Sequence, residues 1–275
     1  MTDDALLELA ASLAARAGTA ILAVRARGFA VERKEDRSPV TEADRAAEAI
    51  IVAGLRAAVP EIPVIAEEEM SAGHVATQGP CFWLVDPLDG TREFAAGREG
   101  FVVNIGLVRD GRPALGVVGV PSTGTLYGAI AGRGAWRQDP TGRHPIAARP
   151  PPAEGLTVLA SRSHGDTPRL EAFLAGSPVV RVEKYGSALK ICRLAEGAAD
   201  LYPRFGRTME WDTAAPQAIL EAAGGSIRTL DGAVLGYGKP GWENPDFVCA
   251  GRVSGFLMAQ ITPLAMGRLN HCCRK

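Results

Sequence analysis

Two segments near the N-terminus repeat apolar residues at helical spacing. The first is rich in alanine and leucine and runs from Ala5 to Arg25. The polar stretch ERKEDRSPV then interrupts the pattern, and TEADRAAEAIIVAGLRAAV resumes it from residue 41. A period near 3.6 with one apolar face predicts an amphipathic helix in each segment.

Short β-type runs follow these helices. IPVIA (62–66) and CFWLV (81–85) each end at acidic residues. Between residues 101 and 131 the runs FVVNIGLV, PALGVVGV and TLYGAIA are separated by RDGR and PSTG, which are typical turn sequences. This part of the chain predicts strands at 62–66 and 81–85, followed by an antiparallel meander.

The stretch 139–155, DPTGRHPIAARPPPAEG, is the richest in proline and glycine and marks a boundary. After it, the strand-like runs LTVLA, PVVRVE and DLYPRF alternate with helical segments, which predicts an α/β arrangement. The prediction is an N-terminal half at 1–150, a C-terminal half at 151–250 and a tail at 251–275. The tail has no assigned function, and we expect a short docked helix or a disordered end there.

Composition narrows the class of partners. The 275 residues include 30 basic and 31 acidic side chains, so a net charge of -1 gives no general attraction to nucleic acid or anionic membranes. No apolar run approaches the roughly 18 residues of a membrane span, and MTDDALLELA lacks the features of a signal peptide. We expect a cytoplasmic protein without nucleic-acid partners or stable membrane insertion, and peripheral association at the inner face of the cell membrane stays open. The sequence does not decide between a monomer and a homodimer.

Cysteine and histidine spacing excludes the common soft-metal sites. The four histidines fit no metal-ligand spacing, so a bound metal would need oxygen ligands. The thiols suggest neither a disulfide framework nor a zinc ribbon, and we expect reduced, mostly buried cysteines. They are Cys81, Cys192, Cys249, Cys272 and Cys273.

Acidic residues collect at three predicted element ends. AEEE follows IPVI, DPLD follows CFWLV, and Asp212 opens a helix in EWDTAAPQAIL. Ligands of open α/β sheets gather just beyond the strand ends, so the three clusters could meet in one crevice. Carboxylates gathered in this way need a cation, and magnesium prefers about six oxygen ligands.

The motif DPLDGT can itself supply several ligands. Its proline fixes φ and forces a turn, so Asp86 and Asp89 can point to the same side with the carbonyl of Leu88 exposed between them. If GTREF begins a helix, the N–H groups of Gly90 and Thr91 form an anion site beside the cation.

Each motif also has an ordinary structural interpretation. The DG pair is a common surface turn, and EEE is typical of a solvated acidic edge. Asp212 could be a helix N-cap, and Thr41 with Asp44 resembles a capping box. Taken one at a time, the motifs do not decide between a turn and a metal site.

In combination and order, the motifs resemble the magnesium-dependent, lithium-sensitive phosphatase superfamily that includes inositol monophosphatases and fructose 1,6-bisphosphatases. The shared pattern is an acidic pair after a strand, then WLVDPLDGT, then WDTAA. The resemblance implies an αβαβα sandwich with an antiparallel-rich N-terminal sheet and a smaller C-terminal α/β half, and two or three Mg²⁺ ions. The implied metal ligands, with Glu68 as the alternative to the first, are Glu67, Asp86, the Leu88 carbonyl, Asp89 and Asp212.

The same resemblance implies catalytic roles. Asp44 and Thr91 would orient the attacking water, and Glu67 would help to hold the metal that activates it. The Gly90 and Thr91 amides would bind phosphoryl oxygens. We expect direct hydrolysis without a covalent intermediate, since Cys81 begins an apolar strand and no CxxxxxR loop follows it.

A narrower resemblance over residues 5–247 is to the CysQ-type family of bacterial 3'(2'),5'-bisphosphate nucleotidases (EC 3.1.3.7). It is carried by SRSH, GSALK and YPRFG. It implies hydrolysis of adenosine 3',5'-bisphosphate, and of its phosphosulfate form as an open point, to support sulfur assimilation. An inositol-1-phosphate or sugar-phosphate phosphatase and a non-catalytic nucleotide-binding regulator remain alternatives. The implied substrate-binding residues, besides Gly90 and Thr91, are His164, Ser187, Lys190, Arg204 and Asp212.

Overall fold

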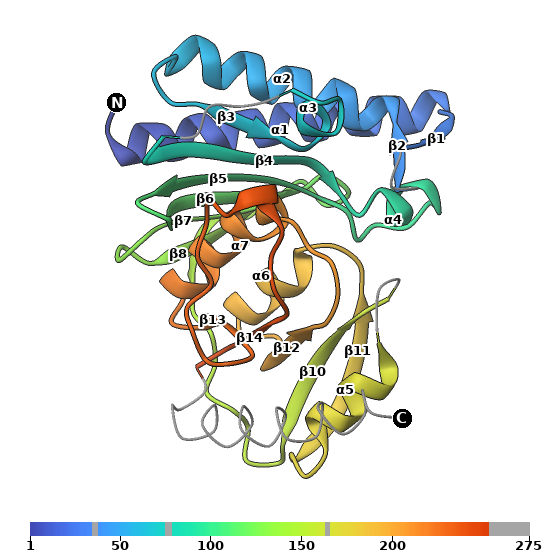
Figure 1. Cartoon of the computed structure of the whole chain (residues 1–275), viewed down its shortest axis with the longest axis vertical. Coiled ribbons are helices and arrows are strands. Elements are labelled where there is room, and N and C mark those ends of the chain that lie inside the picture. Colours follow the sequence, from blue (N-terminus) through green and yellow to red (C-terminus); the bar gives the residue numbers. More distant parts are fainter. Residues whose placement is uncertain (35–37, 75–78, 163–165, 253–275) are drawn as a thin grey trace.

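In the described part of the chain, two large β-sheets alternate with three helical layers (Figure 1). The predicted substrate residue His164 and residues 253–275, which make up most of the predicted tail, lie outside the part of the chain that can be described. The computed structural model describes residues 1–34, 38–74, 79–162 and 166–252.

The outer layer contains α1 (Asp3–Arg27) and α2 (Glu42–Ala58), which pack on one face of the larger sheet (Figure 1). Both helices are confirmed, and α1 extends two residues beyond the prediction at each end. By length and hydropathy α1 could also cross a membrane. Its apolar side, including Leu13 and Ile21, is buried in the core beneath α2, so α1 is accounted for as a core helix.

The larger sheet has seven strands in the order β3-β4-β5-β6-β7-β8-β9. β3 pairs with β4 in parallel, and all the later pairs are antiparallel, which confirms the predicted meander. Asp110 and Gly111 both have positive φ in the β5–β6 hairpin, as a type I′ turn requires. The strands are β3 (Val64–Ala66), β4 (Cys81–Asp89), β5 (Val102–Arg109), β6 (Arg112–Val120), β7 (Thr125–Ile130), β8 (Ala135–Asp139) and β9 (Gly142–Ile146).

Strand β4 differs from the prediction at the DPLD motif. We expected the strand to end at Val85 and the motif to turn away, but β4 continues to Asp89. Its register with β5 shifts between Asp86 and Asp89. The predicted turn is therefore an irregularity within the strand, of the β-bulge type, because the proline cannot donate to the ladder and the chain still follows β5.

The smaller sheet has five strands in the order β11-β10-β12-β14-β13. Strand β10 is parallel to both of its neighbours, and β14 is antiparallel to β12 and β13. β14 lies within the sheet, although it begins at Phe247, the last residue that the narrower resemblance covers. The strands are β10 (Leu156–Ser161), β11 (Val179–Tyr185), β12 (Leu201–Arg204), β13 (Ser226–Thr229) and β14 (Phe247–Ala250).

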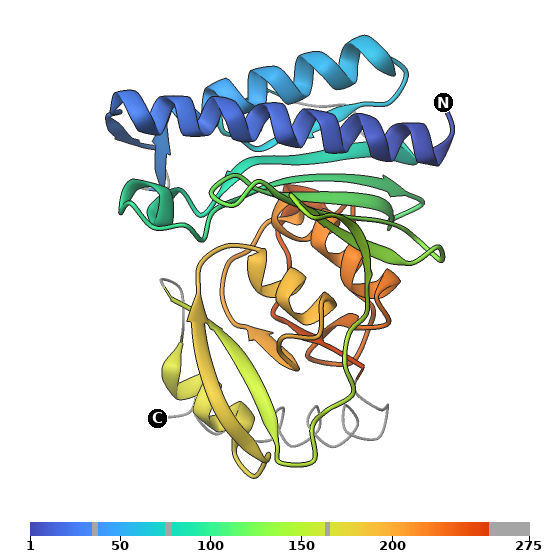
Figure 2. The ribbon, with the colours of Figure 1, turned by 180° about the vertical axis from the view of Figure 1, so that it is seen from behind.

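Helices α6 (Leu189–Ala195) and α7 (Glu210–Ala222) fill the space between the two sheets, and α5 (Thr167–Leu174) covers the outer face of the smaller one (Figure 2). Side chains of α6 and α7 share a core with residues of both sheets. These five layers confirm the predicted αβαβα arrangement.

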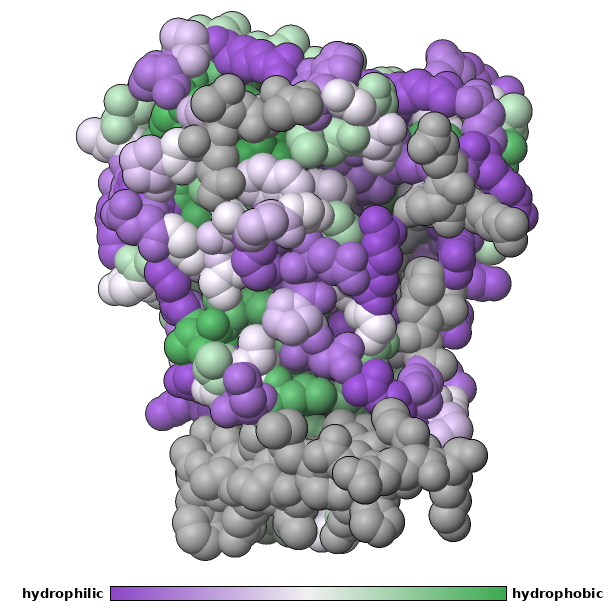
Figure 3. Space-filling view, viewed as in Figure 1, coloured by the Kyte–Doolittle hydropathy of each residue, from purple (hydrophilic) through white to green (hydrophobic). Residues whose placement is uncertain are grey.

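Several short elements complete the described chain. β1 and β2 form a two-stranded antiparallel sheet just before α2. The face in Figure 3 is largely hydrophilic along its upper edge, where the α1–α2 layer lies, and its hydrophobic patches are small. The remaining elements are β1 (Val31–Arg33), β2 (Pro39–Thr41), α3 (Glu67–Ser71), α4 (Thr91–Ala95) and the 3-10 helix η1 (Pro240–Trp242).

Candidate active site

Three predicted metal ligands from distant parts of the sequence meet at one point. Glu67 begins α3 directly after β3, Asp86 lies in the irregular part of β4, and Asp212 is the third residue of α7. One carboxylate oxygen from each lies within 4.8 Å of the other two. The fold thus brings the three acidic clusters into one crevice, as expected from their places at element ends.

The other two predicted ligands lie beside this cluster. The Asp89 carboxylate accepts a hydrogen bond from the Ala188 N–H, just before α6, and it lines the same cavity as the three acids. The Leu88 side chain is buried, and its carbonyl oxygen lies 3.1 Å from the Thr91 hydroxyl oxygen. Both groups therefore present oxygen atoms at the edge of the cluster.

Burial and mutual repulsion perturb these acids strongly. Burial, followed by the charges of Glu67, Asp89 and Asp212, raises the pKa of Asp86 well above its usual value. Burial and then the charges of Asp89 and Glu67 raise the pKa of Asp212 to about 7. Carboxylates that repel one another in this way favour a bound cation. A donor set made only of oxygens fits Mg²⁺ or a similar hard ion.

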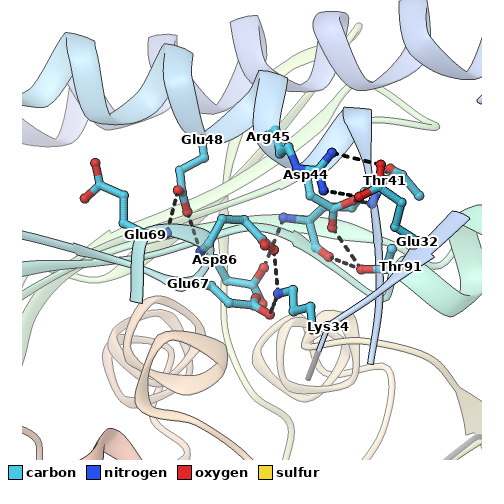
Figure 4. Close-up of polar contacts among 12 residues, drawn as sticks. Glu32, Lys34, Thr41, Asp44, Arg45, Glu48, Glu67, Glu69, Asp86 and Thr91 are labelled. Atoms are coloured by element: carbon cyan, nitrogen blue, oxygen red, sulfur yellow. Dashed lines mark hydrogen bonds and ion pairs between the residues drawn. The ribbon is translucent and has the colours of Figure 1, made fainter. Parts of the chain in front are cut away.

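Lys34 contacts the cluster and was not predicted from the sequence. Its ammonium lies 2.7 Å from Glu67 Oε1 (Figure 4). It also lies 2.6 Å from Glu68 Oε1. Burial alone would lower the pKa of Lys34, but the two carboxylates raise it overall. Glu68 is directed to Lys34, whereas Glu67 also reaches Asp86 and Asp212, so the geometry favours Glu67 as the ligand.

Asp44 links the start of α2 to the start of α4. Its Oδ2 accepts from both the backbone N–H and the hydroxyl of Thr41, each at 2.7 Å, and its Oδ1 accepts from the Thr91 hydroxyl at 3.0 Å (Figure 4). Burial raises the pKa of Asp44, although the bonds from Thr41 and Thr91 oppose the rise. The predicted capping box is present, and the same carboxylate also contacts Thr91.

Residue 90 must be a glycine, because the N-terminal and C-terminal halves of the chain approach each other closely there. Gly90 precedes α4 with φ of 93°, in the left-handed region that glycine adopts freely. A Cβ here would lie 3.2 Å from the Ser187 Cβ and 3.3 Å from the Gly100 carbonyl oxygen. Any larger residue would push α4 away from the segment before α6.

The predicted nucleotide residues line the same cavity from the C-terminal half. Ser187 has φ of 51°, which is uncommon for a residue other than glycine. Lys190 is buried and donates to the Ser187 carbonyl at 2.5 Å, and burial lowers its pKa to about 8. Both side chains lie opposite α4.

Arg204 is a buried residue. Its side chain donates to the Thr208 hydroxyl and to the Arg207 carbonyl oxygen, both at 2.7 Å. Arg207 is exposed and lines the same cavity, and it was not predicted from the sequence. Its place directly after YPRFG was the one signal that could have drawn attention to it.

The fold and these motifs define a member of the inositol monophosphatase family. The pattern of that family matches residues 3–264, so the chain belongs to it. Among solved structures, an inositol monophosphatase from Anabaena (Nostoc) sp. PCC 7120 is 25% identical, with a TM-score of 0.77 and coverage of 96% of both chains.

More specific relatives carry the name CysQ. The 3'(2'),5'-bisphosphate nucleotidase CysQ of Salmonella typhimurium is 43% identical over 88% of this chain and 98% of its own length. The crystal structure of CysQ from Bacteroides thetaiotaomicron is 33% identical, has a TM-score of 0.74, and is matched over 90% of this chain and 97% of that one.

Proposed function

We propose that this protein is a magnesium-dependent 3'(2'),5'-bisphosphate nucleotidase that hydrolyses adenosine 3',5'-bisphosphate to AMP and phosphate. One observation carries the proposal: a single cavity is lined both by the carboxylate cluster and by the basic residues Lys190, Arg204 and Arg207. The acids suit the metal-assisted cleavage of one phosphate, and the bases suit a second phosphate on the same substrate. The similarity to the CysQ nucleotidases supports the same substrate class.

The oxygen donors would hold two or three Mg²⁺ ions, the last of them more weakly. When bound, Mg²⁺ supplies a water of lowered pKa and stabilises charge on the leaving ribose oxygen. The buried Asp86 would be one of the ligands, since a bound cation would offset the neighbouring charges that oppose its ionisation. The proposed ligands are Glu67, Asp86, the Leu88 carbonyl, Asp89 and Asp212.

The remaining residues would orient the reactants. The Thr91 hydroxyl donates to Asp44, which leaves its lone pairs free to accept from the attacking water. The N–H groups of Gly90 and Thr91 would hold phosphoryl oxygens at the start of α4. Ser187 and Lys190 would contact the nucleoside half together with Arg204, and His164 belongs to the same proposal on sequence grounds. Water attacks phosphorus directly.

The decisive experiment compares phosphate release from adenosine 3',5'-bisphosphate and inositol 1-phosphate, with Mg²⁺ and with EDTA. We expect a strong preference for the bisphosphate, dependence on Mg²⁺, and loss of turnover in Asp89→Asn. A preference for inositol 1-phosphate would support the alternative of an inositol-1-phosphate or sugar-phosphate phosphatase. Nucleotide binding without turnover would support the alternative of a non-catalytic nucleotide-binding regulator.

Adenosine 3'-phosphate 5'-phosphosulfate belongs in the same assay as a second candidate substrate. We further propose a cytoplasmic enzyme, a monomer or homodimer, that acts in sulfur assimilation. The near-neutral net charge of -1 is consistent with a small-molecule substrate rather than nucleic acid as the partner. Light scattering of the purified protein tests the oligomeric state, and cell fractionation tests the location.

A further inference from the structure

Glu48 is a buried acidic residue of α2 to which neither the catalytic nor the substrate-binding proposal gives a role. Its side chain is 6% exposed. Its Oε2 accepts from the backbone N–H of Glu68 at 2.7 Å, and its Oε1 accepts from that of Glu69 at 2.9 Å (Figure 4). Both carboxylate oxygens are thus committed to the backbone of α3.

The backbone groups that Glu48 binds belong to the first turn of α3. N–H groups in a first helical turn have no acceptor within their own helix. The residue before α3 is Ala66, which provides no side-chain cap. With only five residues, α3 is too short to be stable without tertiary contacts. A carboxylate from α2 therefore takes the place of the missing N-cap.

The place of α3 determines where Glu67 lies. Glu67 is the first residue of α3, and its carboxylate must reach Asp86 and Asp212 from there. A small rotation of this single turn would move the carboxylate out of the cluster. The contacts of Glu48 with the two following residues resist that rotation.

Helix α2 holds the other side of the site in the same way. Asp44 and Glu48 are four residues apart, so they lie on the same face of the helix. Asp44 binds Thr91 at the start of α4, while Glu48 binds the start of α3. One helix therefore sets the distance between the group that would orient water and the acid that would hold the metal.

We propose that Glu48 is a positioning residue that fixes Glu67 in the carboxylate cluster and thereby sets the affinity for divalent cations. The inference rests on the metal dependence of the proposed function but not on the identity of its substrate. Outer hydrogen-bond partners of metal ligands commonly change metal affinity by about 10- to 100-fold.

Three variants separate hydrogen bonding from charge. Glu48→Gln keeps the length of the side chain but offers one acceptor oxygen, and Glu48→Asp keeps the charge but is one methylene too short to reach α3. Arg56→Gln is the matched control, because Arg56 joins the same two helices through an exposed ion pair with Glu69. Each full-length protein is titrated with Mn²⁺ in the absence of substrate. Electron paramagnetic resonance measures the free Mn²⁺, which gives the affinity of each variant for the ion.

We expect Glu48→Gln and Glu48→Asp to bind Mn²⁺ about tenfold more weakly than the wild type, and Arg56→Gln to remain within about twofold. Circular dichroism confirms that each variant is folded before titration. In the activity assay, the Mg²⁺ concentration at half-maximal rate should rise in the two Glu48 variants, while kcat at saturating Mg²⁺ recovers toward the wild-type value.

Three results would overturn the inference. Folded Glu48 variants that melt at lower temperature but bind Mn²⁺ like the wild type would show a purely structural role. Wild-type affinity in Glu48→Asp with weak binding in Glu48→Gln would show that charge, rather than contact with α3, is what matters. A wild-type protein that binds no Mn²⁺ would instead remove the proposed metal-dependent function, and the positioning role would fall with it.

Discussion

Replacing Thr91 with valine tests the proposed alignment of the attacking water. The substitution removes the hydroxyl that donates to Asp44 Oδ1 at 3.0 Å and keeps the branched shape of the side chain. Positioned proton-transfer groups contribute about 10²- to 10⁴-fold to rate. Because Asp44 and the metal ligands remain in Thr91→Val, we expect kcat to fall by about 10²- to 10³-fold, or roughly 3 to 4 kcal/mol on the barrier.

The same substitution should affect folding much less. Asp44 keeps both of its bonds from Thr41, so the loss of one further hydrogen bond should lower the free energy of unfolding by about 1 to 2 kcal/mol. The pKa of Asp44 should rise further, because the Thr91 bond is one of the contacts that now oppose burial.

Initial rates of phosphate release from adenosine 3',5'-bisphosphate, with thermal melts of the same samples, measure both effects. Thr91→Ser is the control: it restores the donor and should recover most of kcat. A folded Thr91→Val protein with kcat within about threefold of the wild type would refute the role assigned to this hydroxyl. A rise in KM at unchanged kcat would instead assign Thr91 to substrate binding.

Three further outcomes follow from the site. Gly90→Ala should lower activity strongly with little change in a distant probe such as far-UV circular dichroism, because its Cβ would crowd Ser187; wild-type activity would contradict this. Burial and neighbouring carboxylates raise the folded-state pKa of Asp212 from 3.8 to about 7, so its contribution to stability is complete below about pH 4 and is lost as pH rises through about 7. Calorimetry should therefore show a larger Mg²⁺-induced rise in melting temperature near pH 8 than near pH 5.5, and the reverse order would contradict the assignment. Lys34→Met should lower the stability of the metal-free protein and raise its affinity for Mn²⁺, because the ammonium and the metal compete for Glu67. A lower affinity for Mn²⁺ would show that Lys34 supports metal binding instead.

The elements that could be predicted are those whose pattern is local. Helices α1 and α2 repeat their apolar residues over more than four turns, and each is preceded by a residue with a capping side chain, Thr2 and Thr41. The meander was predictable because each strand is apolar and the intervening sequences favour turns. β9 was missed because its residues are mostly exposed, and β13 and β14 were missed as well, although the equally short β12 was predicted.

The acids of the proposed metal site were predictable for a different reason. Glu67 and Asp212 stand at the start of a helix, whereas Asp86 and Asp89 lie in the irregular last part of β4. The family motifs then ordered them along the chain. What the sequence could not supply was how the groups contact one another. Glu48 looks like a polar residue on an amphipathic helix, and only the packing of α2 against α3 directs it inward. Lys34 lies in a polar stretch without periodicity, so nothing local indicated that it would reach Glu67.

Glu48 and Lys34 help to hold the mutually repelling carboxylates of the site in place. Asp86 is buried among carboxylates that oppose its ionisation, which destabilises the metal-free protein at neutral pH. Lys34 offsets part of this repulsion through Glu67, and Glu48 prevents α3 from relieving it by moving away. An ion present at 100 times its dissociation constant would add about 2.7 kcal/mol of stability. The arrangement therefore keeps the acids in place before the metal arrives, and metal binding then stabilises a site that is already built.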